Sequence, residues 1–550
     1  MSRFRTALRF IAFLMVLLVV LSVVQRRFIP KWDYPTHFSR TGRAVQGVYH
    51  EPKHSLDVLW LGASHMQNAA SPMLLYQQTG IRSYNLATTG QPLPASYQIL
   101  KNVLKEQSPK VVIIDVGHAM SGSRYQKTEP AWRKIIDSTP FAYLPAKLEM
   151  AINMVKLNPD RMDLEDVCSG VLPILRYHTN YNLEQIDYLD THSDQVYAIK
   201  GQSCVGKQDA APKDVWADYV AEEPNPKRIE RLQGILDAQS DTLQKIADLC
   251  RKEHCDLVFT KVPVGTTRAA YSGYWDQEKH DLIQALADAL GVPFIDTNYE
   301  DLGIDWKQDT CDKGMHLNMN GSAKFTDFFG KWLTDRYDFA DTGSPELTML
   351  WDAQTGIFNH EAECVAIFAE PDLQTYLNRL QNGNYTVFTA VAGTVGENWS
   401  KEYQNSLFAV LGSERNLWKR YNAGEESIAY AAIGSAGRSV GEVFNKKKGT
   451  LKGQLEDGAE YTVKSVNDGG VGTASIVING EEMITEGDGI HFVVYDNDIH
   501  CVIDSATFDT LSKDCPVTHG KFTVTEFREG VLEYEYGALK ELYRKTNIMR

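Results

Sequence analysis

The chain has 550 residues, of which 43% are hydrophobic and 23% are charged, so it holds enough apolar side chain for globular domains and is not a disordered tail. At roughly 150 residues per domain the length predicts two to four units, of which two large domains are expected, and no repeat typical of a solenoid is found. The 56 Lys and Arg residues against 71 Asp and Glu residues give a net charge of −15, without a basic stripe interleaved with aromatic residues. This balance argues against nucleic acid as a partner.

The cysteines give no metal signal. Eight of them are sparse for this length and form no C-x-x-C pair, so no metal site is predicted, and no motif indicates a cofactor. Most are expected to be small buried apolar residues. In an oxidising compartment Cys250 could bridge to Cys255, or Cys501 to Cys515.

The N-terminus carries an apolar segment. Phe10–Val24 contains no charge and is flanked by Arg9 and by the pair Arg26 and Arg27. The segment is shorter than the ~20 residues of a full span, but the stems of the flanking arginines can snorkel. We predict a single-pass signal anchor over residues 1–28. A cleaved signal peptide is the alternative, although no small-residue cleavage site follows the segment.

Residues 29–340 show an alternating pattern of short apolar runs and longer amphipathic stretches. Runs this short and rich in β-branched residues are typical of parallel strands covered on both faces. The predicted strands are 56–61, 83–87, 111–116, 257–262 and 292–296, and the predicted helices are 71–78, 94–107, 226–254, 275–290 and 320–337. The alternation predicts a doubly wound, mostly parallel α/β sheet. Chemistry in such a sheet gathers beyond the carboxyl ends of its strands.

Two further regions have a different pattern. Residues 127–223 interrupt the alternation and predict an insertion over the active face. Residues 341–550 are rich in Gly, Thr and Val, with predicted strands at 385–390, 450–466, 473–479 and 489–504 and many turns, and predict a mixed α+β domain.

Ser64 follows the first predicted strand, at a strand-to-helix turn, where a serine is either a nucleophile or an N-cap. A hydroxyl needs a base within hydrogen-bond reach, and His316 precedes the last predicted helix. Asp312 would fix the tautomer of His316, with Asp309 as the fallback. Taken alone, His316 could be a solvated loop histidine and Asp312 a turn residue.

An acyl-transfer site also needs donors for the developing oxyanion. The candidates are the backbone amide of Ser64 and Gly90 after the second strand, although Gly90 could equally be a turn glycine. His118, in Asp115–His118 after the third strand, could supply a further polar donor.

These motifs resemble the SGNH (GDSL-like) hydrolase superfamily over about Leu56–Tyr337. The resemblance rests on Gly62-Ala63-Ser64, on Gly90, and on the block from Asp312 to His316. It implies that Ser64 is the nucleophile, His316 the base, Asp312 the orienting carboxylate and Gly90 an oxyanion donor. The chain departs from the family at His118, where an Asn usually follows Gly, and in having three residues between Asp and His where two are usual.

Within that superfamily the chain looks most like the membrane-anchored, extracytoplasmic members of the DltD and AlgX/AlgJ type. The most specific stretches are Leu59–His65 and Ser83–Ala87, and they add Asn85 to the candidate substrate or oxyanion residues. The resemblance implies a cell-membrane location, a polysaccharide substrate and a polytopic membrane-bound O-acyltransferase as partner.

Residues Ala474–Thr510 resemble the interleukin-like EMT-inducer (ILEI/PANDER) domain, with Phe508-Asp509 as its Phe-Asp pair. Leu373–Ala390 resembles the helix and strand of the same family in reversed chain order, which a circular permutation would explain. The resemblance implies a carbohydrate-binding module. Four aromatic residues could stack on sugar rings or belong to the core, namely Trp399, Trp418, Tyr421 and Tyr430.

Three functions therefore remain open. The first is transfer of an acyl group, acetyl by preference, to or from a cell-surface polysaccharide through a Ser64 ester. The second is a plain carbohydrate esterase, in which water resolves the same ester. The third is a non-catalytic assembly protein that holds the polymer near a membrane complex.

Overall fold

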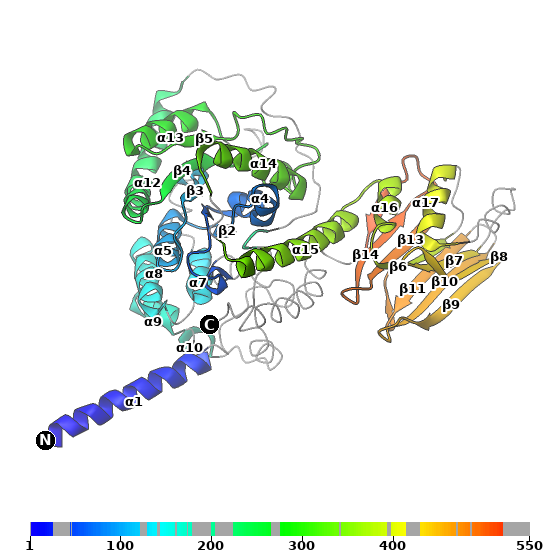
Figure 1. Ribbon diagram of the computed structural model, residues 1–550, viewed down its shortest axis with the longest axis horizontal. Helices are drawn as coiled ribbons and strands as arrows, with labels where there is room; N and C mark the ends of the chain where they lie inside the picture. The colour runs from blue at the N-terminus through cyan, green and yellow to red at the C-terminus, as the bar shows by residue number, and fades with distance from the viewer. Residues whose placement is uncertain are drawn as a thin grey trace. The chain divides into compact units, whose positions relative to one another are not determined.

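A computed structural model describes residues 2–25, 45, 47–120, 129–139, 143–159, 162–172, 174–178, 200–203, 224–265, 275–339, 343–392, 398–413, 429–468, 471–484 and 487–520. The chain forms two compact units, which divide between Phe358 and Asn359 inside helix α15 (Pro345–Phe368). The division falls C-terminal to the predicted boundary at residues 340 and 341. The labelled elements of both units can be followed in Figure 1.

The N-terminal helix α1 (Ser2–Gln25) contains one apolar window, Phe4–Leu21, that is long enough to cross a membrane. Length and composition fit a membrane span and a signal sequence equally well. The flanking Arg26 and Arg27 lie outside the described residues.

The first unit is built on a five-stranded parallel sheet in the order β2-β1-β3-β4-β5. Its strands all fall within or next to the predicted runs: β1 (Val58–Leu61), β2 (Ser83–Asn85), β3 (Val111–Asp115), β4 (Asp256–Lys261) and β5 (Phe294–Asp296). The register pairs Leu61 with Ile114 and Lys261 with Asp296, so the carboxyl ends of these strands share one edge. The prediction of an α/β unit with a parallel sheet is confirmed.

Helices cover both faces of this sheet, which explains why its central strands β1 and β3 are buried along their whole length. Leu59 and Val112 face a core that contains residues of α5 (Leu93–Val103), α12 (Pro226–Lys252) and α13 (Gln277–Leu290). Trp60 and Ile113 point the other way, into a core with α3 (Ser64–Ala69), α4 (Pro72–Thr79) and α14 (Met319–Arg336).

The predicted insertion at 127–223 is described only in part. It contains four helices in the described residues, α7 (Glu129–Ser138), α8 (Leu144–Leu157), α9 (Leu164–Val171) and α10 (Ile174–Tyr177). Trp132 and Met150, from α7 and α8, are buried in the same core as α5. The described part of the insertion therefore belongs to the hydrophobic core of the first unit.

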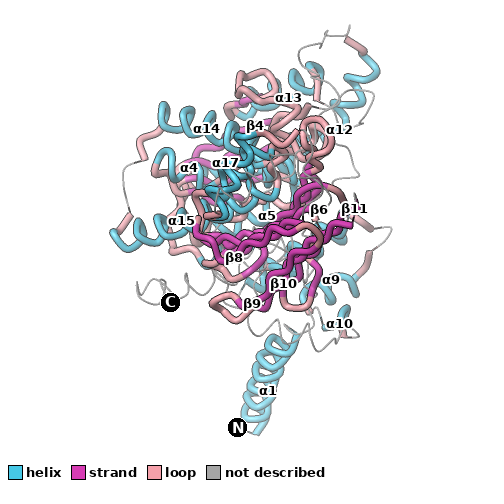
Figure 2. Tube along the Cα trace, turned by 90° about the vertical axis from the view of Figure 1, so that its right-hand side faces the viewer, coloured by secondary structure: helices cyan, strands magenta, loops and turns pink. Residues whose placement is uncertain are grey.

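The second unit consists of two antiparallel sheets, in the orders β15-β14-β13-β6-β7-β8 and β12-β11-β10-β9. The first contains β6 (Tyr385–Ala392), β7 (Ala429–Ser435), β8 (Arg438–Asn445), β13 (Gly489–Asp496), β14 (Cys501–Phe508) and β15 (Val517–His519); the second contains β9 (Lys448–Gln454), β10 (Glu460–Asp468), β11 (Val471–Ile478) and β12 (Glu481–Glu482). Figure 2 shows β8, β9 and β10 as neighbouring strands. The segments 450–466 and 489–504, each predicted as one strand, prove to hold parts of two strands joined by a turn.

A core between the two sheets includes Phe388, Val463, Ile476 and Val493. Helix α16 (Leu373–Leu380) packs elsewhere on the larger sheet, where the Tyr376 ring contacts Phe492 and its hydroxyl donates to a buried Asp504 oxygen at 2.7 Å. Helix α17 (Lys401–Leu411) lies beside α16.

Of the alternatives left open for the aromatic residues and the cysteines, the described residues favour core positions and free thiols. Trp399 and Tyr430, which were candidates for sugar stacking, are buried and only 7% and 2% exposed, so neither presents a face to a ligand. Trp418 and Tyr421 lie outside the described residues. The candidate disulfide partners Cys250, Cys255, Cys501 and Cys515 are all free thiols.

Candidate active site

A sharp turn carries Ser64 past the end of β1. Gly62 has φ +151°, and a Cβ at this position would lie 2.9 Å from Met66 Cβ and 3.0 Å from Asp115 Cβ. Only glycine fits this backbone angle and this space. Helix α3 then begins at Ser64, with Ala63 rather than Ser64 as its N-cap, so the capping explanation for this serine is wrong.

A tight loop before α14 carries His316. Thr310 and Leu317 pair in an antiparallel bridge, and Lys313 and Gly314 turn the chain with φ values of 61° and 89°. Asp312 accepts from the backbone N–H of His316 at 2.6 Å and contacts its Nδ1 at 2.5 Å through the second carboxylate oxygen. Both carboxylate oxygens thus fix the orientation of the ring.

His316 Nε2 lies 2.8 Å from Ser64 Oγ. Because a carboxylate oxygen accepts, a neutral His316 ring carries its proton on Nδ1 and leaves a lone pair on Nε2. That lone pair can accept the Ser64 hydroxyl proton. The three residues therefore have the contacts of a serine–histidine–aspartate triad.

Packing between the start and the end of the first unit brings the two segments together. The Ser322 hydroxyl, on α14, donates to the carbonyl of Ala69 at the end of α3, at 2.9 Å. Thr326, one turn later, accepts from the backbone N–H of Ser71 at 3.1 Å. Asn318 caps α14 and donates to the carbonyl of Gln308, which holds the His316 loop against the helix.

Two predicted residues have structural partners instead. Asp309, the fallback orienter, is buried, forms an ion pair with Lys324 at 2.6 Å and accepts from the backbone of Asp305. Asn85 is buried, and its amide nitrogen donates to the carbonyls of Met66 and Ala70, at 2.9 Å each. With both amide hydrogens engaged, Asn85 ties β2 to α3 and does not donate to a substrate in this structure.

Gly90 lies in a loop that is linked to α3. Its φ of +69° is left-handed, and the neighbouring Thr89 hydroxyl contacts Gln67 Oε1 at 3.1 Å, one helical turn after Ser64. An added Cβ at Gly90 would lie 3.9 Å from Ala131, so the backbone angle rather than crowding requires glycine. The Ser64 amide makes no hydrogen bond within the described part of the chain, which leaves it available as an oxyanion donor.

His118, the other candidate donor, is in the 3-10 turn η2 (Gly117–Met120). Its Nδ1 lies 3.1 Å from the carbonyl of Gln91, which can only accept, so Nδ1 carries the proton. Burial lowers the pKa of His118, despite the opposing effect of Asp115. A neutral ring in this tautomer offers a lone pair at Nε2, so His118 is not an oxyanion donor in this arrangement.

The sequence interpretation missed a group of polar residues around the triad. The His65 ring lies 4.7 Å from that of His316, and burial, followed by nearby Lys261, holds the pKa of His65 well below its usual range. Lys261 ends β4 and is itself buried, which lowers its pKa against the opposing charges of Asp115 and Asp296. Inspecting the last residue of every strand would have found Asp115, Lys261 and Asp296.

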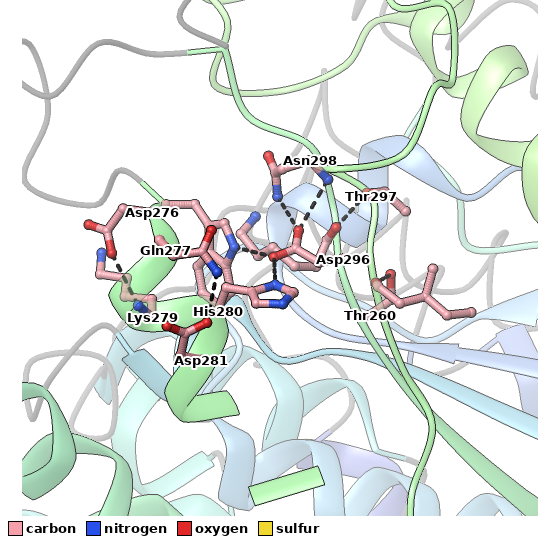
Figure 3. Close-up of polar contacts among 12 residues, drawn as sticks. Thr260, Asp276, Gln277, Lys279, His280, Asp281, Asp296, Thr297 and Asn298 are labelled. Atoms are coloured by element: carbon pink, nitrogen blue, oxygen red, sulfur yellow. Dashed lines mark hydrogen bonds and ion pairs between the residues drawn. The ribbon is translucent and has the colours of Figure 1, made fainter. Parts of the chain in front are cut away.

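A second His–Asp pair joins the last residue of β5, Asp296, to His280 of α13. Figure 3 shows Asp296 between His280 and Asn298. Its carboxylate lies 2.9 Å from His280 Nδ1 and 2.7 Å from the Asn298 amide nitrogen. Trp275 Nε1 also donates to Asp296. Asp296 raises the pKa of His280 through their hydrogen bond. Asp296 thus links the segments before and after β5 through its hydrogen bonds with these side chains.

Metal-ligating side chains do not gather at the triad in the described residues. The described chain has one cluster of ligand atoms with suitable spacing, formed by His360, Cys364 and Asp496 of the second unit.

The parallel sheet and the Ser64–His316–Asp312 contacts define an α/β unit with a serine triad geometry. No protein-family profile and no curated protein matches the chain. Among solved structures, the chain is similar to a Bacteroides fragilis protein described as a "putative acylhydrolase", with 11% sequence identity and a TM-score of 0.24 over 56% of this chain and 98% of that one. A TM-score this low carries no argument about fold or activity, so the site is interpreted from its own geometry.

Proposed function

We propose that the chain is a serine acyl-transfer enzyme of the SGNH type. The observation that carries this proposal is the 2.8 Å contact between His316 Nε2 and Ser64 Oγ, with His316 held by both oxygens of Asp312. A serine hydroxyl paired with an oriented imidazole is the arrangement that activates a nucleophile.

The residues would act in two steps. Ser64 Oγ attacks the carbonyl carbon of an acyl ester while His316 takes the hydroxyl proton, and the oxyanion binds the Ser64 amide and the Gly90 loop. His316 then gives its proton to the leaving alcohol, and an acyl ester remains on Ser64. A second hydroxyl group then loses its proton to His316 and takes the acyl group, and His316 returns that proton to Ser64 Oγ, which restores the free serine.

The particular enzyme that we propose is an extracytoplasmic O-acyltransferase that acts on a cell-surface polysaccharide, with acetyl as the acyl group. The support is the motif resemblance to the DltD and AlgX/AlgJ type, together with an N-terminal helix that is apolar enough to be an anchor. A polytopic O-acyltransferase would then be the membrane partner, and the ILEI-like second unit would hold the polysaccharide.

A carbohydrate esterase is the second candidate. Ser64 itself is only half-buried in the described structure, so the residue that would carry the acyl group is not sealed from water. An acyl group on Ser64 would then be resolved by water unless a sugar hydroxyl excludes it.

The test is covalent labelling of the purified chain with a serine-directed fluorophosphonate. We expect one label per chain, which Ser64→Ala removes and the control Ser240→Ala on α12 retains. Failure of the wild-type chain to label or to cleave an acetyl ester would overturn the proposal and favour a non-catalytic assembly role. Product analysis with an oligosaccharide acceptor separates transfer from hydrolysis.

A further inference from the structure

A cluster of three possible metal ligands lies in the second unit, far in sequence from the triad. His360 Nε2, Cys364 Sγ and an Asp496 oxygen all lie within 4.8 Å of one another. Asp496 is fully buried, Cys364 is buried, and the His360 side chain is 27% exposed. The group therefore has a buried base and one side open to solvent.

The secondary structure sets this arrangement. His360 and Cys364 are four residues apart on α15, so they point from the same face of the helix. Asp496 ends β13 and is paired with Tyr385 of β6 on one side and with Cys501 of β14 on the other. The carboxylate is thus fixed by a central strand, while the nitrogen and sulfur come from the helix.

One oxygen of Asp496 already faces both other ligands. Oδ2 lies 2.7 Å from His360 Nε2 and 3.8 Å from Cys364 Sγ. Oδ1 accepts instead from the backbone N–H groups of Asp498 and Ile499, which hold the carboxylate in place. Oδ1 is therefore held by the backbone, whereas Oδ2 faces the position that a cation would occupy.

We propose that His360, Cys364 and Asp496 bind a zinc ion, with water in the fourth position. Zinc prefers tetrahedral sets of nitrogen, sulfur and carboxylate oxygen, whereas magnesium and calcium take oxygen ligands alone. Bonds of about 2.0–2.3 Å place tetrahedral ligands ~3.3–3.7 Å apart. Cys364 and Asp496 have nearly that spacing, and His360 needs to withdraw from Oδ2 by less than about 1 Å.

Zinc would replace protons in this cluster. The Cys364 thiol loses its proton to solvent, and so does His360 Nε2, which faces Asp496 Oδ2 and must be deprotonated to bind the ion; the ring then carries its proton on Nδ1. The ion would then join the C-terminal half of α15 to the end of β13 within the second unit. The site is independent of the proposed acyl transfer, so either can fail without the other.

Cobalt substitution of the purified full-length chain tests the site, because a tetrahedral Co²⁺–thiolate centre has strong visible and near-ultraviolet absorption. We expect one Co²⁺ per chain, displaced by one Zn²⁺, and a rise in the thermal midpoint of the second unit with zinc. The spectrum of the Co²⁺-substituted wild-type chain is enough to support or overturn the proposed site, without any variant. A chain that binds neither ion after reduction would overturn the proposal.

Matched variants assign the ligands. Cys364→Ser is expected to remove the thiolate absorption, and His360→Gln to weaken zinc binding at least tenfold. The control Cys515→Ser, a buried free thiol of the same unit, is expected to change neither. Retention of the absorption in Cys364→Ser, or a disulfide between Cys364 and Cys501 found by mass spectrometry of the unreduced chain, would contradict the site.

Discussion

The first unit contains two His–Asp pairs at the same edge of its parallel sheet, and they differ in what surrounds the carboxylate. Asp312 is 42% exposed and holds only the ring and backbone of His316, whose far nitrogen contacts Ser64 Oγ. Asp296 is 2% exposed and accepts from Trp275, His280 and Asn298. A His–Asp contact alone therefore does not make a catalytic pair; the group on the second ring nitrogen decides.

The largest expected difference is in kcat, between the variant that lacks His316 and the variant that lacks His280. His316→Ala should lower kcat by about 10⁴–10⁶-fold, because the base for Ser64 is lost. His280→Ala should change kcat by less than about tenfold, because its ring contacts no reacting atom. Ester hydrolysis measured at saturating substrate checks both variants. Equal losses of kcat in the two variants would contradict the distinction between the two His–Asp pairs.

Neutralising each carboxylate should separate activity from stability. Asp312→Asn should lower kcat by about 10²–10⁴-fold, because an amide no longer enforces the Nδ1 proton of His316. Asp296→Asn should instead lower the free energy of unfolding by about 1–3 kcal/mol, because the donors around it lose a charged acceptor. We would measure kcat and the free energy of unfolding in urea for both variants. An unchanged kcat in Asp312→Asn would contradict the role of Asp312 as the orienting carboxylate.

The turn at Gly62 positions Ser64, whose hydroxyl contacts His316 and distinguishes the His316–Asp312 pair from the His280–Asp296 pair. Gly62→Ala should destabilise the first unit by about 2–4 kcal/mol and displace Ser64, because of the φ of +151° and the 2.9 Å approach to Met66. Gly90→Ala, with room for a Cβ, should cost only about 1 kcal/mol. Thermal unfolding of the two variants ranks them, and the reverse order would show that crowding at Gly62 relaxes.

The smallest expected effect is on the pH dependence of stability. Asp296 raises the pKa of His280 above the ordinary value of 6.5, so this pair stabilises the fold fully at pH values below 6.5. The contribution is lost as the pH rises through the raised pKa. His280→Gln should therefore lower the thermal midpoint more at acidic than at alkaline pH.

The His65→Gln variant is the control for that dependence. Burial holds the pKa of His65 well below 6.5, so protonation of the unfolded chain destabilises the fold as the pH falls below 6.5. Removing this ring should relieve the loss of stability at acidic pH, with the sign opposite to His280→Gln. Parallel pH profiles of the same sign would contradict the two assignments.

Much of the first unit could be predicted from local sequence. The five strands follow from short, mostly apolar runs such as Val111–Ile114, since residues covered on both faces are predominantly apolar. The same pattern located Ser64 and His316 beyond strand ends and before helices. Their catalytic roles stay predictions, as do the domain assignments of the two units.

Only the tertiary structure decided which polar side chains meet. The sequence favoured Asp312 over Asp309 without excluding either, and the structure separates them: Lys324 pairs with Asp309, while the Lys313–Gly314 turn folds Asp312 onto His316. Likewise, nothing in the spacing of His360 and Cys364 predicts Asp496, more than a hundred residues away. Local patterns record which residues avoid water, whereas hydrogen bonds between distant segments depend on how the packed elements bring them together.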